Sequence, residues 1–189
     1  MPAELFGIDH SSKIAIVCTI EECCVRGRTD EDAEAIAGIF AHYATTSLVT
    51  FETAPLPAST WSQRIGSAEV AGLPFLVLVR AGEVRGFGYA APWRPKPAYR
   101  HTIEVSTYLH PDDTGRGYGR RLLDELLARC AAAGARQAIA VIADSGSPAS
   151  EHLHRAAGFE VAGRLSRVGH KHGRWLDTIL MQRELAGTA

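Results

Sequence analysis

The sequence predicts a single α/β domain in which helices pack on one mixed sheet. Two observations lead to this prediction. The chain has 189 residues, a common length for one globular domain. Its second half contains two successive units of strand, loop and helix, and two further strands follow them. Strands that alternate with helices in this way are typical of folds built on one central sheet.

The composition is that of a water-soluble protein, and its charges nearly balance, so it has no strong long-range electrostatic field. Hydrophobic residues make up 46% and charged residues 22% of the chain, and the net charge is -1. A chain without excess positive charge does not gather nucleic acid. Its apolar stretches are shorter than the roughly 20 residues that span a bilayer, and its start lacks the basic region of a secretory signal. We therefore expect a cytoplasmic protein with no membrane or nucleic-acid partner. The four cysteines lack CxxC spacing, so we expect reduced thiols.

The first part of the chain is expected to contain an extension and then a helix. We expect residues 1–22 to be an N-terminal extension of uncertain structure, with a possible strand at 14–17, residues 23–185 to be the domain, and residues 186–189 to be a tail. Thr29 and Asp32 match a helix-capping pattern, Ser/Thr-x-x-Asp/Glu. Apolar residues follow at helical spacing, namely Ile36, Ile39, Phe40 and Tyr43.

Three strands are predicted in the centre of the chain. After a proline-containing loop and a short helix at residues 61–65, residues 75–80 and 84–91 have the pattern of a hairpin about Ala81-Gly82-Glu83. Residues 102–109 form the next strand. Alternation places Glu104 in a row with Ser106 and Tyr108, so it is the one carboxylate in an uncharged row.

The two units of strand, loop and helix follow. A glycine-rich segment at residues 114–119 (TGRGYG) leads into a helix with an apolar stripe, in which Cys130 is expected to be structural. The second unit has a strand at 138–142, a loop at 144–148 and a helix that ends at Gly158. Two last strands are expected at 159–165 and 175–183, around a loop at 169–174.

The glycine-rich segment has the chemistry of a phosphate site. Glycines permit sharp turns, and the N-terminus of the following helix offers free N–H groups and partial positive charge. Arg116, Arg120 and Arg121 add charge that can meet a pyrophosphate or a 3′-phosphate. A nucleoside-triphosphate loop would need a Gly-Lys pair, which the chain lacks, and the spacing G-x-G-x-G is not that of a dinucleotide site. A tight turn without a ligand remains the alternative.

These features resemble the GNAT superfamily of N-acetyltransferases, whose coenzyme A loop reads Q/R-x-x-G-x-G/A between a strand and a long helix. The resemblance extends to its phosphinothricin and methionine sulfoximine N-acetyltransferases. It rests on AGIFAHY (37–43), VTFET (49–53), PWRPKPAYR (92–100), EVSTYL (104–109), SEHLHRAAGF (150–159) and VGHKHGRWLD (168–177). It implies a mixed, mostly antiparallel sheet of about six to seven strands with about four helices.

The resemblance implies acetyl-CoA as cosubstrate and a set of residues that bind it. Two departures bear on that binding: Thr114 stands where Gln or Arg is usual, and Ser147 where Asn is usual. Backbone N–H groups freed by a bulge at residues 107–109 would pair with pantetheine amides and stabilise the oxyanion. The implied residues are Thr107, Tyr108, Leu109, Thr114, Gly115, Arg116, Gly117, Tyr118, Gly119, Arg120, Ser147 and Ser150.

Two residues are candidates for the chemistry. Glu104 matches the family's general base, and partial burial would raise its pKa toward the working range. His154 lies where this subfamily carries histidine and could protonate or orient the departing thiolate. The alternatives are a surface glutamate paired with Arg100 and a helix-face histidine bonded to a neighbour.

The expected acceptor is the amino group of a small amino acid of the phosphinothricin, methionine sulfoximine or methionine sulfone class. Arg94, Lys96 and Tyr99 could hold its carboxylate, and Phe51, Lys171 and Trp175 could wall the pocket by resemblance. The alternatives are another amine, such as a polyamine, an aminoglycoside or a protein N-terminus, and a non-catalytic CoA-binding sensor. We expect no metal, and a homodimer by resemblance.

Overall fold

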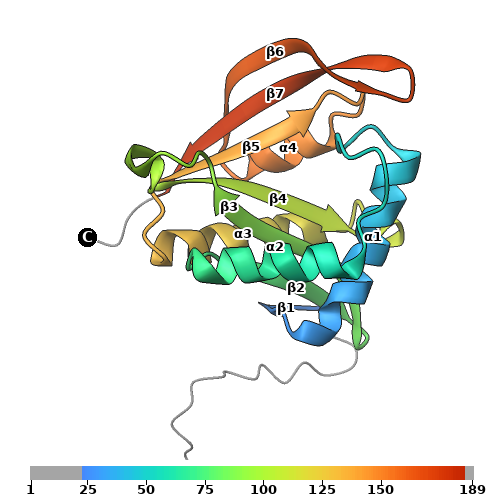
Figure 1. Cartoon of the computed structure of the whole chain (residues 1–189), viewed down its shortest axis with the longest axis vertical. Coiled ribbons are helices and arrows are strands. Elements are labelled where there is room, and N and C mark those ends of the chain that lie inside the picture. Colours follow the sequence, from blue (N-terminus) through green and yellow to red (C-terminus); the bar gives the residue numbers. More distant parts are fainter. Residues whose placement is uncertain (1–22, 186–189) are drawn as a thin grey trace, which may run out of the picture.

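The computed structural model describes residues 23–185, so the expected extension at 1–22, its possible strand at 14–17 and the tail at 186–189 lie outside the described residues. One mixed sheet in the order β1-β2-β3-β4-β5-β7-β6 forms the centre, and β4 and β5 are its one parallel pair in the described residues. The predicted fold class is confirmed (Figure 1). The strands are β1 (Cys24–Gly27), β2 (Phe75–Arg80), β3 (Glu83–Pro92), β4 (Thr102–Leu109), β5 (Gln137–Ala143), β6 (Glu160–Lys171) and β7 (Arg174–Glu184). The α-helices are α1 (Ala33–Thr46), α2 (Ala58–Val70), α3 (Tyr118–Ala132) and α4 (Ala149–Ala156).

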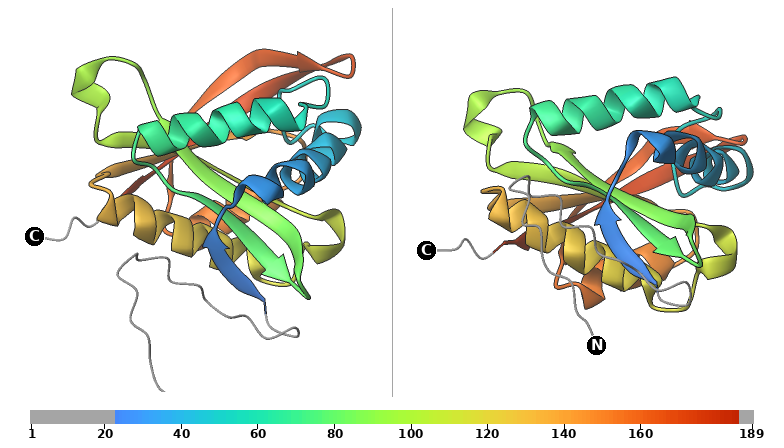
Figure 2. Two further views of the ribbon diagram at one scale, coloured as in Figure 1. Left: turned by 60° about the horizontal axis from the view of Figure 1, so that its bottom comes forward. Right: turned by 90° about the horizontal axis from the view of Figure 1, so that it is seen from below.

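Helices cover both faces of the sheet. Leu76 and Leu78 of β2 pack into the core formed with α3, whereas Phe75 and Val77 pack against α1 and α2. This alternation follows from the period of a strand. Figure 2 shows α1 and α2 on one side of the sheet and α3 and α4 on the other. The domain therefore has two hydrophobic cores that share one sheet.

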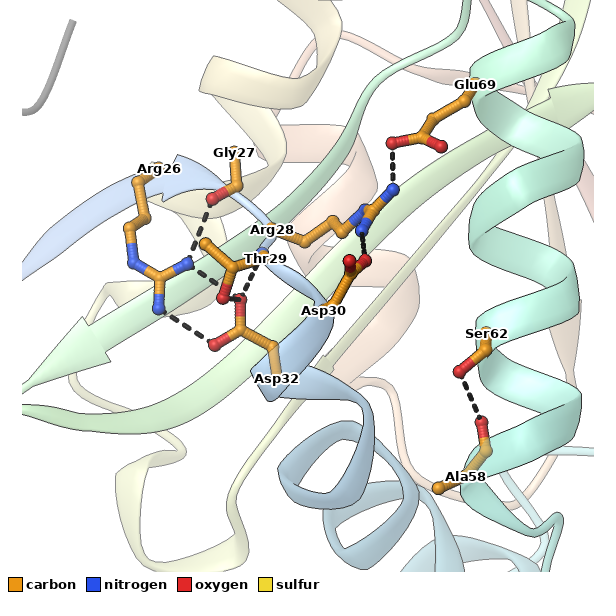
Figure 3. A network of polar contacts seen from close by, with 9 residues as sticks. All are labelled: Arg26, Gly27, Arg28, Thr29, Asp30, Asp32, Ala58, Ser62 and Glu69. Carbon is orange, nitrogen blue, oxygen red and sulfur yellow. Dashed lines mark hydrogen bonds and ion pairs between the residues drawn. The ribbon is translucent and has the colours of Figure 1, made fainter. Parts of the chain in front are cut away.

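The first strand and helix are joined by a polar network (Figure 3). Arg26 of β1 donates to both carboxylate oxygens of Asp32, at 2.7 and 2.8 Å. The Thr29 N–H donates to Asp32 Oδ2 at 2.6 Å, so the predicted capping role of Asp32 is confirmed. Burial opposes ionisation, but these hydrogen bonds lower the pKa of Asp32. Arg28 pairs with Asp30 and with Glu69 of α2, which ties the end of β1 to that helix.

Most expected elements are confirmed, with three differences. The helix at residues 61–65 is the centre of a longer helix, α2. The expected loop at 169–174 is wrong, because β6 and β7 continue to a two-residue turn at His172 and Gly173. Their φ angles of 47° and 72° suit a tight hairpin. β1 was not predicted from the sequence.

The expectation of reduced thiols holds for part of the chain. In residues 23–185, Cys23 and Cys130 are free thiols, whereas Cys24 is disulfide-bonded. That expectation is therefore wrong for Cys24, since spacing along the chain does not test pairing through space. No helix in the described region is long and apolar enough to cross a membrane.

Candidate active site

The site begins where β4 and β5 part. The two strands pair from Thr102 with Gln137 to Val105 with Ala140, and both then continue without pairing to each other. Their outer edges remain occupied, because Leu109 pairs with Gly86 of β3 and Ala143 pairs with Thr178 of β7. The inner edges therefore face each other with free peptide groups. Such a wedge can accept an extended ligand that carries amides.

A cavity of about 580 Å³ follows this wedge. Its wall is formed by the parting ends of β4 and β5, the glycine loop and one side of α4. Most of the residues expected to bind the cosubstrate meet there, although their elements are far apart in the sequence. Those that line it are Thr107, Tyr108, Leu109, Thr114, Gly115, Gly117, Gly119, Arg120, Ser147 and Ser150.

Two of the expected cosubstrate residues do not line the cavity. Arg116 is exposed at the tip of the loop. Tyr118 is partly buried against the α3 core, and the Arg80 guanidinium lies 6.0 Å from the centre of its ring. Tyr118 therefore has a packing role in this structure.

The glycine loop turns the chain directly into α3. Gly115 and Gly117 have φ angles of 73° and 80°, a region that strains other residues, and Gly117 is the N-cap of the helix. The first-turn N–H groups of α3 thus point out of the loop toward a ligand site. Thr114, the departure from the family pattern, donates its hydroxyl to the Pro111 carbonyl at 3.0 Å.

The free N–H groups near residues 107–109 do not come from a bulge. β3 and β4 pair without a register shift, so the expected bulge is wrong. The groups are free because β4 turns away from β5. Tyr43 of α1 holds this end of β4, since its hydroxyl donates to the Leu109 carbonyl at 2.7 Å. Tyr43 also lines the cavity, and the sequence pattern had placed it only on the apolar face of a helix.

Glu104 lies on β4 just before the wedge. It is half-buried between Ala91 of β3 and Ile139 of β5. Burial raises its pKa, and the positive charge of Arg94 opposes that shift. A carboxylate in this setting is better suited to accept a proton near neutral pH than an exposed one. Glu104 does not itself line the cavity, whereas its neighbour Val105 does.

His154 faces the cavity from the last turn of α4. It is 5% exposed, and its Nδ1 lies 2.8 Å from the Ser150 carbonyl oxygen. A carbonyl can only accept, so Nδ1 carries the proton. Burial lowers the pKa of His154, which favours the neutral ring. Nε2 is buried with no hydrogen-bond partner among residues 23–185 and is then an acceptor. The sequence had suggested that His154 could protonate the departing thiolate. In this structure the neutral ring has no proton on Nε2 to donate.

The residues expected to bind the acceptor fall into two groups. Arg94, Lys96 and Tyr99 are exposed on the connection between β3 and β4, which leads into the start of β4. Phe51, Lys171 and Trp175 lie on the loop after α1 and at the tip of the β6–β7 hairpin. These segments occupy opposite ends of the sheet (Figure 1). Neither group lines the cavity, so the expected common wall is not formed within one chain in the described residues.

Lys171 has a different role from the one expected. Its side chain is 2% exposed, and its ammonium donates to the carbonyls of Thr50 at 2.9 Å and Tyr43 at 3.3 Å. A Cβ at Gly169 would overlap the Phe51 ring, so the ring packs directly on β6. Lys171 and Gly169 together fix the loop that carries Phe51. In the described residues no cluster of His, Cys, Asp or Glu could hold a metal ion.

Comparisons with known proteins give the family context of this geometry. Residues 36–159 match the acetyltransferase (GNAT) family. The chain is 47% identical to a phosphinothricin N-acetyltransferase of Alcaligenes faecalis, over 94% of this chain and 90% of that protein. It is 44% identical to an L-methionine sulfoximine/L-methionine sulfone acetyltransferase of Pseudomonas aeruginosa, over 62% of this chain and 68% of that protein. A phosphinothricin acetyltransferase from Sinorhizobium meliloti, solved with AcCoA, superposes with a TM-score of 0.83 at 40% identity, over 88% and 90%.

Proposed function

Because the chain belongs to the acetyltransferase (GNAT) family, we propose that it transfers the acetyl group of acetyl-CoA to the amino group of a small amino acid of the phosphinothricin, methionine sulfoximine and methionine sulfone class. One observation carries the proposal: the wedge between β4 and β5 opens beside the glycine loop and the half-buried Glu104. The relatives named above support the choice of acceptor.

The groups that line the cavity have the chemistry that acetyl-CoA requires. The free edges of β4 and β5 offer N–H and C=O groups that complement the pantetheine amides. The first-turn N–H groups of α3 and the positive end of its dipole suit a pyrophosphate. Arg120 stands beside them, although its guanidinium is shared with Asp124 at 2.6 Å. Ser147 and Ser150 add hydroxyls on the α4 side.

Glu104 acts as the general base in this proposal. An α-amino group has a reference pKa of about 8, so most of it is protonated at pH 7 and must lose a proton before it attacks. Its nitrogen lone pair then forms a bond to the thioester carbonyl carbon, and the C–S bond breaks. Glu104 accepts the amine proton, directly or through water, and the sulfur leaves as a thiolate that must gain a proton.

His154 serves as a proton acceptor before it can serve as a donor. His154 lines the cavity, its Nδ1 is held by the Ser150 carbonyl, and its buried Nε2 has no hydrogen-bond partner among residues 23–185. The ammonium loses two protons: Glu104 takes the first, and a second one, taken by Nε2 when the amine attacks, would form an imidazolium in a buried site, which would give that proton up readily. The departing thiolate is the base that needs it. His154 would thus relay a proton to the sulfur without changing its Nδ1 contact.

The remaining parts of the proposal concern the acceptor and the assembly. Arg94 is the cation that acts on Glu104, so we assign the acceptor carboxylate to its side of β4. A homodimer is proposed from the resemblance, and a cytoplasmic location is proposed from the sequence features described above. Large apolar side chains exposed on β6 and β7 agree with a paired surface, namely Val161, Leu165, Val168 and Trp175. A single mass of one chain, about 20 kDa, in light scattering would contradict the dimer.

The proposal is tested by thiol release. Purified protein is mixed with acetyl-CoA and, in turn, with phosphinothricin, methionine sulfoximine, methionine sulfone, spermidine and an aminoglycoside, with a reaction lacking acceptor as the control. Release with any of the first three supports the proposal. Release with the cationic amines alone would overturn the acceptor class. Tight binding of acetyl-CoA without turnover on any amine would favour a sensor.

A further inference from the structure

We propose that Asp113 is a positioning residue that orders the glycine loop for acetyl-CoA, and that Arg80 and Arg85 hold it in place. The inference rests on the proposed function, because it assigns the loop to acetyl-CoA. It concerns a group outside the cavity, since Asp113 does not line the space that Thr114 and Gly115 face.

Asp113 is a buried carboxylate held by two cations. It is 0% exposed. Its Oδ2 accepts a hydrogen bond from Arg85 Nε of β3 at 2.6 Å. Its Oδ1 forms an ion pair with Arg80 Nη2 at the end of β2, at 3.1 Å, without hydrogen-bond geometry. A carboxylate removed from water in this way must be compensated by its partners, so the pair of arginines fixes its position.

The position of Asp113 in the chain makes it the anchor of the loop. It ends the 3-10 turn Pro111–Asp113, and the next residue is Thr114. The turn is itself fixed to β3, because the His110 N–H donates to the Arg85 carbonyl at 2.7 Å and the Asp113 N–H donates to the His110 carbonyl at 2.9 Å. Arg85 therefore holds the start of the loop through both its backbone and its side chain.

Arg80 also reaches the far side of the loop. Its guanidinium lies 6.0 Å from the ring centre of Tyr118, the first residue of α3. Asp113 and Tyr118 flank the segment that contains Gly115 and Gly117. One arginine thus contacts both flanks of a segment rich in glycine. Glycine has the most backbone freedom to lose when a ligand binds, so fixing both flanks in advance lowers the entropic cost of binding.

We expect the loss of Asp113 to affect the binding of acetyl-CoA and not that of the acceptor. Arg85 lies beside Gly86, which pairs with Leu109 at the end of β4, whereas Glu104 pairs with Ala91 near the start of that strand. Loss of the carboxylate would leave two partly buried guanidinium groups without their shared partner and would release the start of the loop. Binding of acetyl-CoA should weaken, whereas the acceptor should still meet an unchanged Glu104.

The test compares Asp113→Asn with Asp112→Asn. Asp112 is the matched control, because it lies in the same turn and pairs with the same Arg85, but at 3.8 Å and with a side chain that is 77% exposed, whereas Asp113 pairs at 2.6 Å and is fully buried. Titration calorimetry in the absence of any acceptor measures the Kd for CoA, which depends on the glycine loop. Initial rates give the KM for each substrate. We expect Asp113→Asn to raise the Kd for CoA and the KM for acetyl-CoA by about tenfold or more, with kcat and acceptor KM within about twofold. Asp112→Asn should stay within about twofold in every value.

Two results would overturn the inference. The first is folded Asp113→Asn protein, checked by circular dichroism, whose Kd for CoA matches the wild type. The second is an equal rise in the KM values of both substrates, which is the pattern of general destabilisation. If Asp113→Asn does not fold, the test uses Arg80→Met instead, because Arg80 is half-buried. This variant must raise the Kd for CoA and leave the KM for the acceptor unchanged. Because CoA binding is measured without an acceptor, the result for Asp113 can still be interpreted if the proposed acceptor class is wrong. Wild-type protein that does not bind CoA would refute both proposals.

Discussion

Replacement of Glu104 by glutamine tests the assignment of the base. The amide keeps the size of the side chain but cannot accept the amine proton. Removal of a positioned general base typically costs 10² to 10⁴ in rate. Because Glu104 lies outside the cavity lining, acetyl-CoA should bind as before. We therefore expect kcat to fall by about 10² to 10⁴ at pH 7, with the KM for acetyl-CoA unchanged.

The pH profile of the variant gives a second, sharper expectation. Burial raises the pKa of Glu104, so the wild-type rate should rise with pH as that carboxyl ionises. The variant lacks this group and depends on amine that is already neutral. With an amine pKa of about 8, the neutral fraction is about 10% at pH 7 and about 90% at pH 9. The rate of the variant should therefore rise about tenfold between pH 7 and pH 9, because it follows the titration of the acceptor amine and not that of an enzyme group.

The assay is thiol release at saturating acetyl-CoA, between pH 6 and pH 9. Glu160→Gln is the control, because it makes the same change at an exposed site on β6. The control should keep the wild-type profile. A folded Glu104→Gln protein with wild-type kcat and an unchanged acid limb would refute the reasoning and return Glu104 to a structural role.

Three further predictions follow from the charges and angles of the site. Arg94→Met removes the cation that opposes the raised pKa of Glu104, so the acid limb of kcat/KM should move to higher pH in initial-rate profiles. His154 has a lowered folded pKa, so the protein should lose stability as pH falls from the unfolded value of about 6.5 toward that folded value. His154→Asn should show a smaller drop in Tm over this range in thermal scans. Gly117→Ala places a Cβ on a residue with a φ of 80°, which costs about 1–2 kcal/mol, and should weaken CoA binding about fivefold to thirtyfold in calorimetry.

The sequence was most informative where structure depends on neighbouring residues. The strand at 102–109, the glycine loop and the start of α3 were all predicted, because alternation and glycine placement are local signals. β1 was missed because it has four residues and is stabilised by Arg26 and Arg28 through contacts with later segments. The length of the β6–β7 hairpin depends on a turn at His172 and Gly173 that the single glycine did not reveal.

The site was predicted in composition but not in arrangement. Four residues of the glycine loop meet in the cavity because they are close in sequence, namely Thr114, Gly115, Gly117 and Gly119. The parting of β4 from β5 depends on pairing across the sheet, with β3 on one side and β7 on the other, and no local pattern encodes it. The acceptor residues were grouped by motif alone. The topology then placed the connection between β3 and β4 and the tip of the β6–β7 hairpin at opposite ends of the sheet (Figure 1).

One strand supplies both substrates with their partners, and this favours direct transfer. The edge of β4 facing β5 is free beyond Val105, whereas Glu104 occupies the face of β4 toward α1 and α2. The acetyl donor can therefore lie along the edge while the amine approaches from the face on which Glu104 lies. A covalent route would need a nucleophile in the same place. Cys130 is fully buried in the α3 core, and burial raises the pKa of its thiol to about 12, so it holds no thiolate to attack a thioester. The geometry thus favours a complex in which both substrates are bound before the acetyl group moves.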